Sequence, residues 1–494
     1  MRKFILSIDQ GTTGSTAALV DHHGVWLNAV SVDFAQIFPK PGWVEHDPED
    51  IWSSVKLAVK KLVKKTRVPL SDILSIGITN QRETVVLWDS DTGKPVYNAL
   101  VWQCRRTTNI CEKMKNKGFS KIIKEKTGLV LDPYFSASKV LWILENVPRA
   151  KQLLKSGKLR IGTVDSFLLW RLTGGKSHKT EVSNASRTML MNLNTLDWDP
   201  YLLKLFRIPR ASLPEIHSSD AMFGKTNGLD FLPDGISIAG ILGDQQAALF
   251  GQACFKPGAI KCTFGTGSFI LMNTGNKILS SNYGMLTTVA WKIGSRVSYA
   301  IEGGAFVCGA AVQWLRDGLG IISKSEEVER LAKEVNSSDG VEFVPALTGL
   351  GAPYWNAEAR GVISGITRGT TRGHIARATL EAMALQNVDL ITSMEKDLGR
   401  RIKAINVDGG ATANNLLMQI QSDYLGKKVI RPRIIETTAY GAALVAGLGI
   451  GLWSGPEELV SKWNSDREFS SKISKKEREK RISSWKKAIE RTIF

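Results

Sequence analysis

The chain has 494 residues, 43% of them hydrophobic, and its 65 Lys and Arg against 47 Asp and Glu give a net charge of +18. This length predicts at least two large domains, and the composition is typical of a soluble globular protein. No apolar run approaches the roughly 20 residues that a bilayer span requires, and no signal-peptide pattern begins the sequence. We therefore expect a cytoplasmic protein without membrane insertion. Scattered cysteines without C-x-x-C spacing favour reduced thiols, and the histidines show no zinc-ligand spacing.

Part of the positive charge is concentrated at the C-terminus, where residues 471–494 hold nine Lys and Arg against three Glu. Ile482, Trp485 and Ile489 recur there at helical spacing, which predicts a basic helix docked by an apolar stripe. A strongly basic chain is also typical of nucleic-acid-binding proteins, but no nucleic-acid module is recognisable. We therefore predict that the chain binds no nucleic acid.

The first predicted element is a strand, Phe4–Ile8, which leads through Asp9-Gln-Gly-Thr-Thr-Gly-Ser15 into a second strand, Ala17–Val20. Such a strand–turn–strand unit brings backbone N–H groups and hydroxyls close to an anion without a helix N-terminus. The next predicted elements alternate between helix and strand: Pro48–Lys64, Ile73–Thr79, Thr84–Trp88 and Ala137–Asn146. This alternation predicts the α/β class.

The second half repeats the unit after a predicted helix, Asp244–Gly251, and the turn Lys256-Pro-Gly258. The strand beginning at Ala259-Ile260 leads through Thr263-Phe-Gly-Thr-Gly-Ser268 into a strand, Phe269–Met272. Further on, a strand at Ile402–Val407 is followed by Asp408-Gly-Gly-Ala-Thr-Ala-Asn414 and a helix, Asn415–Ile420. One phosphate-type turn in each half predicts two similar lobes closing on one polyphosphate, with domains at residues 1–250 and 251–494.

Two turns followed by Asp-Gly-Gly before a helix resemble the ATPase fold of actin, the sugar kinases and the heat-shock chaperones. Neither a Walker A loop nor a G-x-G-x-x-G opening a helix occurs. Longer blocks, from about Lys3 to about Trp453, resemble the glycerol kinases of the FGGY carbohydrate kinase family. They are Pro41–Pro48, Ile78-Thr-Asn-Gln-Arg-Glu-Thr84, Val101-Trp-Gln-Cys-Arg-Arg106, Asp132–Ser136, Asn184–Met189, Gly243-Asp-Gln-Gln246 and Thr348–Trp355.

The resemblance implies a two-domain, actin-like (ribonuclease H-like) ATPase fold with a duplicated lobe and ATP in the interdomain cleft. It implies an ATP:glycerol 3-phosphotransferase, which makes sn-glycerol 3-phosphate and ADP with Mg²⁺. Asp244 is then the general base that takes the proton of the acceptor hydroxyl. Asp is also a favoured helix N-cap, and this alternative stands beside the catalytic one. Asp9 would orient Mg²⁺ through water, the alternative being a turn-forming Asp.

The resemblance also assigns the two substrate sites. The residues implied for the polyol are Arg82, Glu83, Tyr134, Asp244 and Gln245, with Trp102 and Phe269 as walls. Those implied for the nucleotide are Thr12, Thr13, Gly265, Thr266, Gly309, Gln313, Gly410 and Asn414. An adjacent Arg and Glu form a surface ion pair in most proteins, and glycines also serve close helix packing, so both alternatives remain open.

The sequence departs from the family at three places. Thr16 stands where many glycerol kinases carry an Arg that contacts nucleotide phosphate. The loop from Asn227 to Gly235 contains Asp230 and Asp234 but no Arg or Lys, which predicts insensitivity to fructose 1,6-bisphosphate at the loop that some relatives use. The loop after Phe223 offers no ready histidine for phosphorylation.

Three alternatives to this function remain open at this point. The chain could be an FGGY kinase for erythritol, xylulose or ribulose. It could be an ATP-binding chaperone or filament protein of the actin-like fold, although such proteins lack a polyol pocket. It could be an inactive paralogue, for which Thr16 is the only hint. The family resemblance further implies a homodimer or homotetramer.

Overall fold

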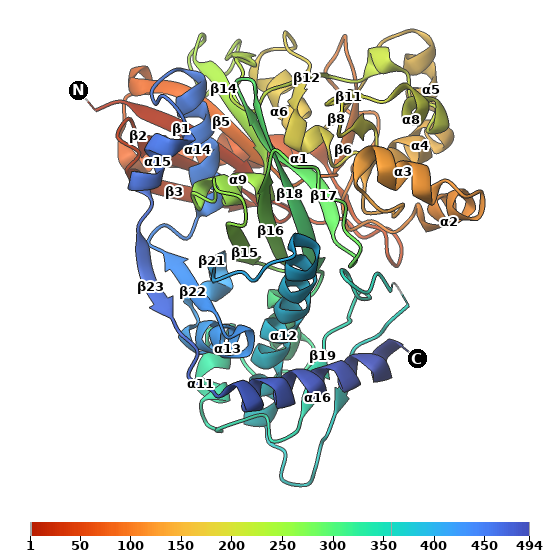
Figure 1. Ribbon diagram of the computed structural model, residues 1–494. Coiled ribbons are helices and arrows are strands. Elements are labelled where there is room, and N and C mark those ends of the chain that lie inside the picture. Colours follow the sequence, from red (N-terminus) through yellow and green to blue (C-terminus); the bar gives the residue numbers. More distant parts are fainter. Residues whose placement is uncertain (1, 357, 494) are drawn as a thin grey trace.

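The computed structural model describes residues 2–356 and 358–493, and two large mixed sheets organise it (Figure 1). The first sheet has the order β13-β14-β5-β1-β2-β3. Strand β1 pairs antiparallel with β2 and parallel with β5, and β5 is parallel to β14. The strands are β1 (Phe4–Gln10), β2 (Gly14–Asp21), β3 (Trp26–Asp33), β5 (Ile73–Asn80), β13 (Gly224–Lys225) and β14 (Ser237–Gly243).

The second sheet repeats this arrangement in the order β17-β18-β16-β15-β21-β22-β23. Strand β15 pairs antiparallel with β16 and parallel with β21, and β21 is parallel to β22. The predicted internal duplication is therefore present in the topology. The strands are β15 (Ile260–Phe264), β16 (Ser268–Gly275), β17 (Leu286–Ile293), β18 (Arg296–Ala305), β21 (Ala404–Asp408), β22 (Lys428–Pro432) and β23 (Ser465–Phe469).

Helices cover both faces of the first sheet, as the alternation of side chains along a strand requires. Phe4, Leu6 and Ile8 of β1 join the core formed with α1 (Pro48–Thr66) and α6 (Val164–Leu172). Ile5, between them, joins the opposite core, which contains α9 (Asp244–Gly251) and α14 (Thr437–Gly449). Helix α14 lies between β22 and β23 of the second sheet in the chain but packs on β14, β5 and β1 of the first, which ties the two halves together.

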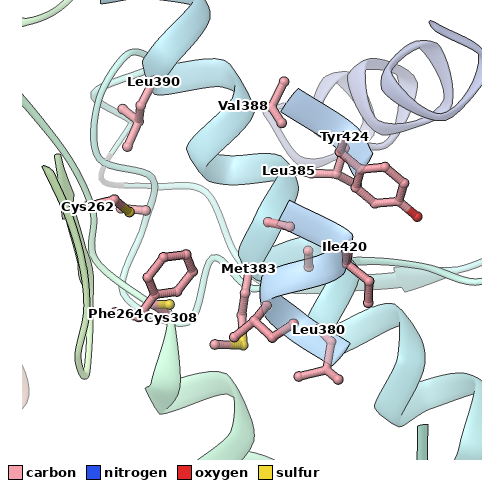
Figure 2. Close-up of a cluster of buried hydrophobic side chains, with 14 of the residues drawn as sticks. Cys262, Phe264, Cys308, Leu380, Met383, Leu385, Val388, Leu390, Ile420 and Tyr424 are labelled. Atoms are coloured by element: carbon pink, nitrogen blue, oxygen red, sulfur yellow. The ribbon is translucent and has the colours of Figure 1, made fainter. Parts of the chain in front are cut away.

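The core behind the second sheet centres on the long helix α12 (Arg372–Leu398). Figure 2 shows Phe264 and Cys308 on the side of this core that faces Met383, with Leu380 further along the helix. Around α12 lie α10 (Gly309–Asp317), α11 (Glu327–Ala332), α13 (Asn415–Leu425), β19 (Glu342–Val344) and β20 (Val362–Ser364). Helix α15 (Pro456–Leu459) instead packs beside α14, where Leu459 joins the core of α9 and α14.

The basic C-terminal helix, α16 (Lys475–Ile493), lies against this second half (Figure 1). Trp485 and Ile489 are buried, and Ile482 packs against the same core. Trp485 Nε1 donates a hydrogen bond of 2.6 Å to Asp389 of α12. The predicted docked helix with its apolar stripe is confirmed.

A third region beside the first sheet builds one wall of the site described below. Its sheet has the order β4-β7-β6-β8, and its core also takes in Leu286, Val289 and Tyr299 of β17 and β18. The elements are β4 (Glu45–His46), β6 (Val85–Asp89), β7 (Ala99–Leu100), α2 (Thr108–Asn116), α3 (Ser120–Thr127), α4 (Ser136–Asn146), α5 (Pro148–Lys155), β8 (Leu159–Thr163), β9 (Lys179–Glu181), α7 (Val182–Ala185), β10 (Met191–Asn192), β11 (Asp197–Trp198), α8 (Pro200–Leu205) and β12 (Glu215–His217).

The predicted elements agree with these bounds to within a few residues at most ends. Helix α9 has its predicted bounds, whereas β15 runs on to Phe264 and α13 to Leu425, beyond the predicted segments. Over the described ranges, every helix falls short of the combination of length and hydropathy that crossing a bilayer requires.

Candidate active site

The carboxyl ends of the parallel strands β1, β5 and β14 meet at one edge of the first sheet. Gln10 and Gly243 both lie opposite Asn80 in the register. Asp9 is the penultimate residue of β1, Arg82 lies two residues beyond β5, and Asp244 is the first residue after β14. Open α/β sheets bind ligands at this edge. The fold therefore brings together residues that are far apart in the sequence.

A cavity of about 170 Å³ opens at this edge, and we call it the charged cavity. It contains every residue that the sequence predicted for the polyol, together with residues of both phosphate-type turns. Its lining is Thr12, Thr13, Arg82, Glu83, Trp102, Tyr134, Asp244, Gln245, Thr263, Gly265, Thr266, Gly267 and Phe269.

Four buried charges form a network behind this cavity: Arg82, Glu83, Arg187 and Glu302, each at most 2% exposed. Arg82 donates through both terminal nitrogens to Glu302, at 2.6 and 2.8 Å. Arg187 donates to Glu83 at 2.6 Å and to Glu302 at 3.1 Å. The alternative of a surface Arg82–Glu83 ion pair is wrong, because both side chains are buried and their nearest charged atoms are 3.9 Å apart. Arg82 is held mainly by Glu302, and Glu83 is held mainly by Arg187.

The network fixes the ionisation of its members. Burial alone would raise the pKa of Glu302, but Arg187 and Arg82 lower this pKa to about 2. Burial raises the pKa of Glu83, an effect that Arg82 and Arg187 oppose. Asp244 joins the network at its exposed edge, where its Oδ1 lies 3.0 Å from Arg82 Nε. Arg82 therefore links the buried charges to the predicted base.

The backbone at Glu83 adopts a left-handed conformation, with φ at 62°. This conformation is uncommon for a residue other than glycine and costs on the order of 1–3 kcal/mol when held at a functional site. Ser136 Oγ donates to the Glu83 carbonyl at 3.0 Å, while Arg187 holds the carboxylate. Gly243 is required beside them, because a Cβ there would lie 2.8 Å from the Arg82 side chain. With the backbone in this conformation, the side chains of Arg82 and Glu83 both line the charged cavity.

Three aromatic rings wall the charged cavity. Trp102 packs edge-to-face against Tyr134 and Phe269, with ring centroids 5.6 and 5.8 Å apart. Trp102 Nε1 donates to Thr12 Oγ1 at 2.9 Å, so this wall is joined to the first turn. Burial raises the pKa of Tyr134, which keeps its hydroxyl neutral.

Asp9, near the end of β1, does not line the charged cavity but is close enough to Asp244 and Glu436 for their charges to act on it. Burial raises its pKa, and the nearby charges of Asp244 and Glu436 raise it further. A divalent cation would relieve this repulsion, and carboxylate oxygens are ligands that Mg²⁺ accepts. Within residues 2–356 and 358–493, no cluster of three or more His, Cys, Asp or Glu side chains is arranged to hold a metal, so Asp9 would be a single protein ligand. The residues present therefore fit a Mg²⁺ held by one carboxylate and by phosphate oxygens.

Asp244 begins α9, whose N-cap is Gly243. Its Oδ1 accepts a hydrogen bond of 2.7 Å from the backbone N–H of Gln245, one residue on. The alternative role of Asp244 as the N-cap is therefore wrong. The carboxylate is 27% exposed and lines the charged cavity, so it is accessible to a ligand there.

A second cavity of about 430 Å³ adjoins the first at Gly265 and Thr266, and we call it the glycine-lined cavity. It contains Gly309, Gln313, Gly410 and Asn414, the other nucleotide residues predicted away from the first turn. The rest of its lining was not predicted: Phe264, Val312, Ser325, Glu326, Val328, Glu329, Leu380, Met383, Ala411, Ala413 and Leu417. The apolar members could not be distinguished from ordinary core residues in the sequence.

The glycine-lined cavity is built largely from helix starts. The Gly309 N–H donates to Gly265 O at 2.9 Å, and a Cβ on Gly309 would lie 2.7 Å from that oxygen. Asn414 is the N-cap of α13, where its Oδ1 accepts from Leu417 N at 2.8 Å. Leu380 and Met383 of α12 supply apolar surface (Figure 2).

Three fully buried charged residues near the charged cavity were missed from the sequence: Arg187, Lys261 and Glu302. Lys261 is the single charge of β15, and Glu302 lies among apolar and small residues in the second half of β18, which is a detectable signal. Arg187 lies in the Asn184–Met189 block, to which we assigned no role.

The departures from the family fall outside the two cavities. Thr16 Oγ1 shares a hydrogen bond of 2.8 Å with Ser31 on the neighbouring strand. Asp230 is paired with Lys56 and Lys60, at 3.2 and 2.9 Å. A third cavity, of about 430 Å³, lies beside this loop and includes Lys176, Lys179 and Lys225 in its lining, so the predicted insensitivity to a bisphosphate stays a prediction. Another hollow, of about 960 Å³, is lined by none of the predicted site residues.

Comparisons with known proteins agree with this geometry. Residues 4–251 match the N-terminal domain of the FGGY family of carbohydrate kinases, and residues 260–450 match its C-terminal domain. The chain belongs to this family. It is 59% identical to a glycerol kinase of Bdellovibrio bacteriovorus and 54% identical to glycerol kinase 2 of Thermotoga maritima, with 99% of each chain covered in both cases.

Solved structures show the same fold. Glycerol kinase of Plasmodium falciparum, solved with ADP, has a TM-score of 0.90 at 38% identity, covering 100% of this chain and 99% of that one. A xylulose kinase of Lactobacillus acidophilus has a TM-score of 0.83 at 22% identity, covering 99% and 97%, which shows the fold alone. The predicted two-domain, actin-like ATPase fold is confirmed.

Proposed function

We propose that this protein is an ATP-dependent glycerol kinase, which converts glycerol and ATP to sn-glycerol 3-phosphate and ADP. The observation that carries the proposal is the charged cavity, because it gathers all the residues that the sequence predicted for the polyol. Its close relatives named as glycerol kinases support the same substrate. The cavity volume of about 170 Å³ is sufficient for a short polyol.

The charged cavity offers both donors and acceptors, as a polyol requires, because each hydroxyl can give and receive a hydrogen bond. Glu83 and Asp244 supply acceptor oxygens, and Arg82 supplies N–H groups. Trp102 and Phe269 would cover the carbon chain. In this arrangement Asp244 takes the proton of the acceptor hydroxyl as the new P–O bond forms.

The adjoining glycine-lined cavity would hold the nucleotide, with its phosphates directed to the two turns. Thr12 and Thr13 of the first turn and Thr266 of the second line the charged cavity, so their hydroxyls and backbone N–H groups face the path of the phosphoryl group. Positioning and charge stabilisation account for most of the catalysis of phosphoryl transfer. Asp9 would hold Mg²⁺, which supplies charge neutralisation at the phosphates when bound.

The proposal includes the predicted division of the chain into two domains. We place the polyol residues and first turn in residues 1–250, and the nucleotide residues and basic helix in residues 251–494. The packing of α14 on the first sheet gives the two domains a shared layer. A homodimer or homotetramer remains a prediction from the family.

A coupled assay that follows ADP release tests the proposed function. Purified protein with Mg²⁺ and ATP is given glycerol, erythritol, xylulose or ribulose in parallel. We expect the highest kcat/KM with glycerol and a product that a 3-phosphate-specific dehydrogenase oxidises. A higher kcat/KM for any other polyol would reassign the substrate, and ligand-dependent light scattering without turnover would favour a filament protein.

A further inference from the structure

Lys261, on β15, is completely buried directly behind the charged cavity, and none of the roles proposed above uses it. Lysine is almost never fully buried unless its ammonium group is satisfied. Its Nζ donates to Gln245 Oε1, to Thr263 Oγ1 at 2.7 Å and to the Phe269 carbonyl at 3.4 Å. All three partner residues line the charged cavity.

These contacts differ from an ordinary buried ion pair, because the three oxygens are neutral. Burial lowers the pKa of Lys261, and the charges of Asp408 and Asp244 oppose this shift. Asp408 is itself engaged elsewhere, accepting from Thr263 Oγ1 at 2.5 Å and from Gln252 Nε2 at 2.9 Å. The direct effect of Lys261 therefore falls on the groups that form the cavity wall.

The contact with Gln245 has a consequence for the chemistry of that wall. A glutamine amide has an accepting oxygen at one end and a donating NH₂ group at the other, and a lysine ammonium group has no acceptor. Only the oxygen of Gln245 can face Lys261, so the NH₂ group is turned away from the lysine. Gln245 is 7% exposed and borders the cavity, which leaves its Nε2 as the end available to a ligand.

We propose that Lys261 is a positioning residue that fixes the Gln245 amide with its donor end toward the substrate. The inference rests on the proposed polyol site. With the amide fixed in this way, the cavity offers both kinds of group to a polyol: Asp244 and Glu83 accept hydrogen bonds, and Gln245 donates one. A hydroxyl beside Gln245 is then bound through its oxygen, and the hydroxyl beside Asp244 is bound through its proton.

A double-mutant cycle tests this coupling. Lys261→Met keeps an unbranched apolar stem but removes the ammonium group with its three N–H donors, so the Gln245 amide is free to turn. An unpaired buried polar group weakens binding, so we expect Lys261→Met and Gln245→Ala each to raise the KM for the polyol by about tenfold. The polyol KM of the double variant should not exceed that of the more impaired single variant, because both changes remove the same interaction. The KM for ATP should change less than about twofold in each.

The outcomes separate a positioning role from a structural one. Additive effects on the polyol KM, or equal effects on the polyol and ATP KM values, would mean that Lys261 only supports the fold. If Lys261→Met does not fold, Gln245→Glu decides the matter, since the carboxylate keeps an acceptor for Lys261 but presents no N–H to the cavity. An increased polyol KM in a variant at least as thermostable as wild type supports the proposal, and an unchanged KM overturns it.

The same experiment distinguishes this inference from the proposed function. Wild-type activity in the substrate panel decides which polyol is used. The variants are compared with wild type on that polyol, whichever it is. A change of substrate would therefore correct the function, and only the loss of coupling between Lys261 and Gln245 would reject the positioning role.

Discussion

The charged cavity and the glycine-lined cavity adjoin at one turn but are built in opposite ways. The charged cavity is lined by ionised and aromatic side chains, which are held in place by Arg187, Glu302 and Lys261 behind them. The glycine-lined cavity is made largely of backbone at helix starts and of apolar side chains from α12 and α13. A small polyol offers only hydroxyls for recognition, so its site needs fixed donors and acceptors, whereas a nucleotide offers a large surface that shape can select.

This difference predicts how each cavity responds to mutation. In the charged cavity every polar group depends on a partner, so one substitution disturbs several others. In the glycine-lined cavity the limiting factor is space, so adding a single carbon matters more than removing a polar group. Three tests with four substitutions probe the contrast, beginning with the largest expected effect.

Asp244→Asn should lower kcat by about 10²–10⁴-fold, the usual contribution of a general base. The amide cannot accept the hydroxyl proton, although it retains the shape of the side chain. Glycerol and ATP should still bind within severalfold of wild type, which calorimetry would measure. Asp317→Asn, at an exposed ion pair with Arg316, is the matched control and should keep wild-type activity. An Asp244→Asn enzyme with half the wild-type rate would remove this residue from the role.

Glu302→Gln should destabilise the protein by about 3–5 kcal/mol, because removing one partner of a buried ion pair leaves uncompensated charge. It should also raise the glycerol KM more than the ATP KM, since an amide keeps only one acceptor oxygen and the bidentate contact of Arg82 with Glu302 is lost. Denaturant unfolding and steady-state kinetics measure the two effects. Glu334→Gln breaks an exposed pair with Arg330 and serves as the control, with an expected change below about 0.5 kcal/mol. Equal effects of the two substitutions would refute the buried network as a source of specificity.

The contrast between the cavities also explains what the sequence revealed in advance. The turns and the Arg82-Glu83 and Gly243-Asp244 blocks were recognisable because they combine glycine with polar residues after apolar strands. The turns predicted the α/β class and two lobes, and the resemblance carried by the longer blocks implied the fold and the polyol and nucleotide residues. Those residues line the two cavities, but most of the lining of the glycine-lined cavity was not predicted. The residue-by-residue roles came from the family resemblance and stay predictions.

Other features depend on contacts between distant parts of the chain. The bidentate pair of Arg82 with Glu302 joins residues 220 positions apart, and no local pattern specifies it. Leu380 and Met383 have the spacing of any buried helix face, so nothing in the sequence separates cavity lining from core. Asp244 was a candidate N-cap because aspartate is favoured at that position, but Gly243 is the N-cap of α9.

The smallest of the three effects should come from two glycines of the glycine-lined cavity. A Cβ on Gly309 would lie 2.7 Å from Gly265 O, so Gly309→Ala must displace backbone and should lower both thermal stability and ATP affinity. A Cβ on Gly410 meets nothing within 4 Å, so Gly410→Ala should leave stability unchanged. If nucleotide occupies that open space, Gly410→Ala raises the ATP KM severalfold.

Both glycine variants should leave the glycerol KM unchanged, since neither residue lines the charged cavity. Thermal unfolding without ligand, followed by KM measurements for each substrate, gives the comparison. A Gly410→Ala enzyme with wild-type ATP KM would place the nucleotide away from this wall. A glycine variant that raised the glycerol KM as much as the ATP KM would instead show that the two cavities respond as one site, because a displacement at the shared Gly265 and Thr266 is transmitted to both.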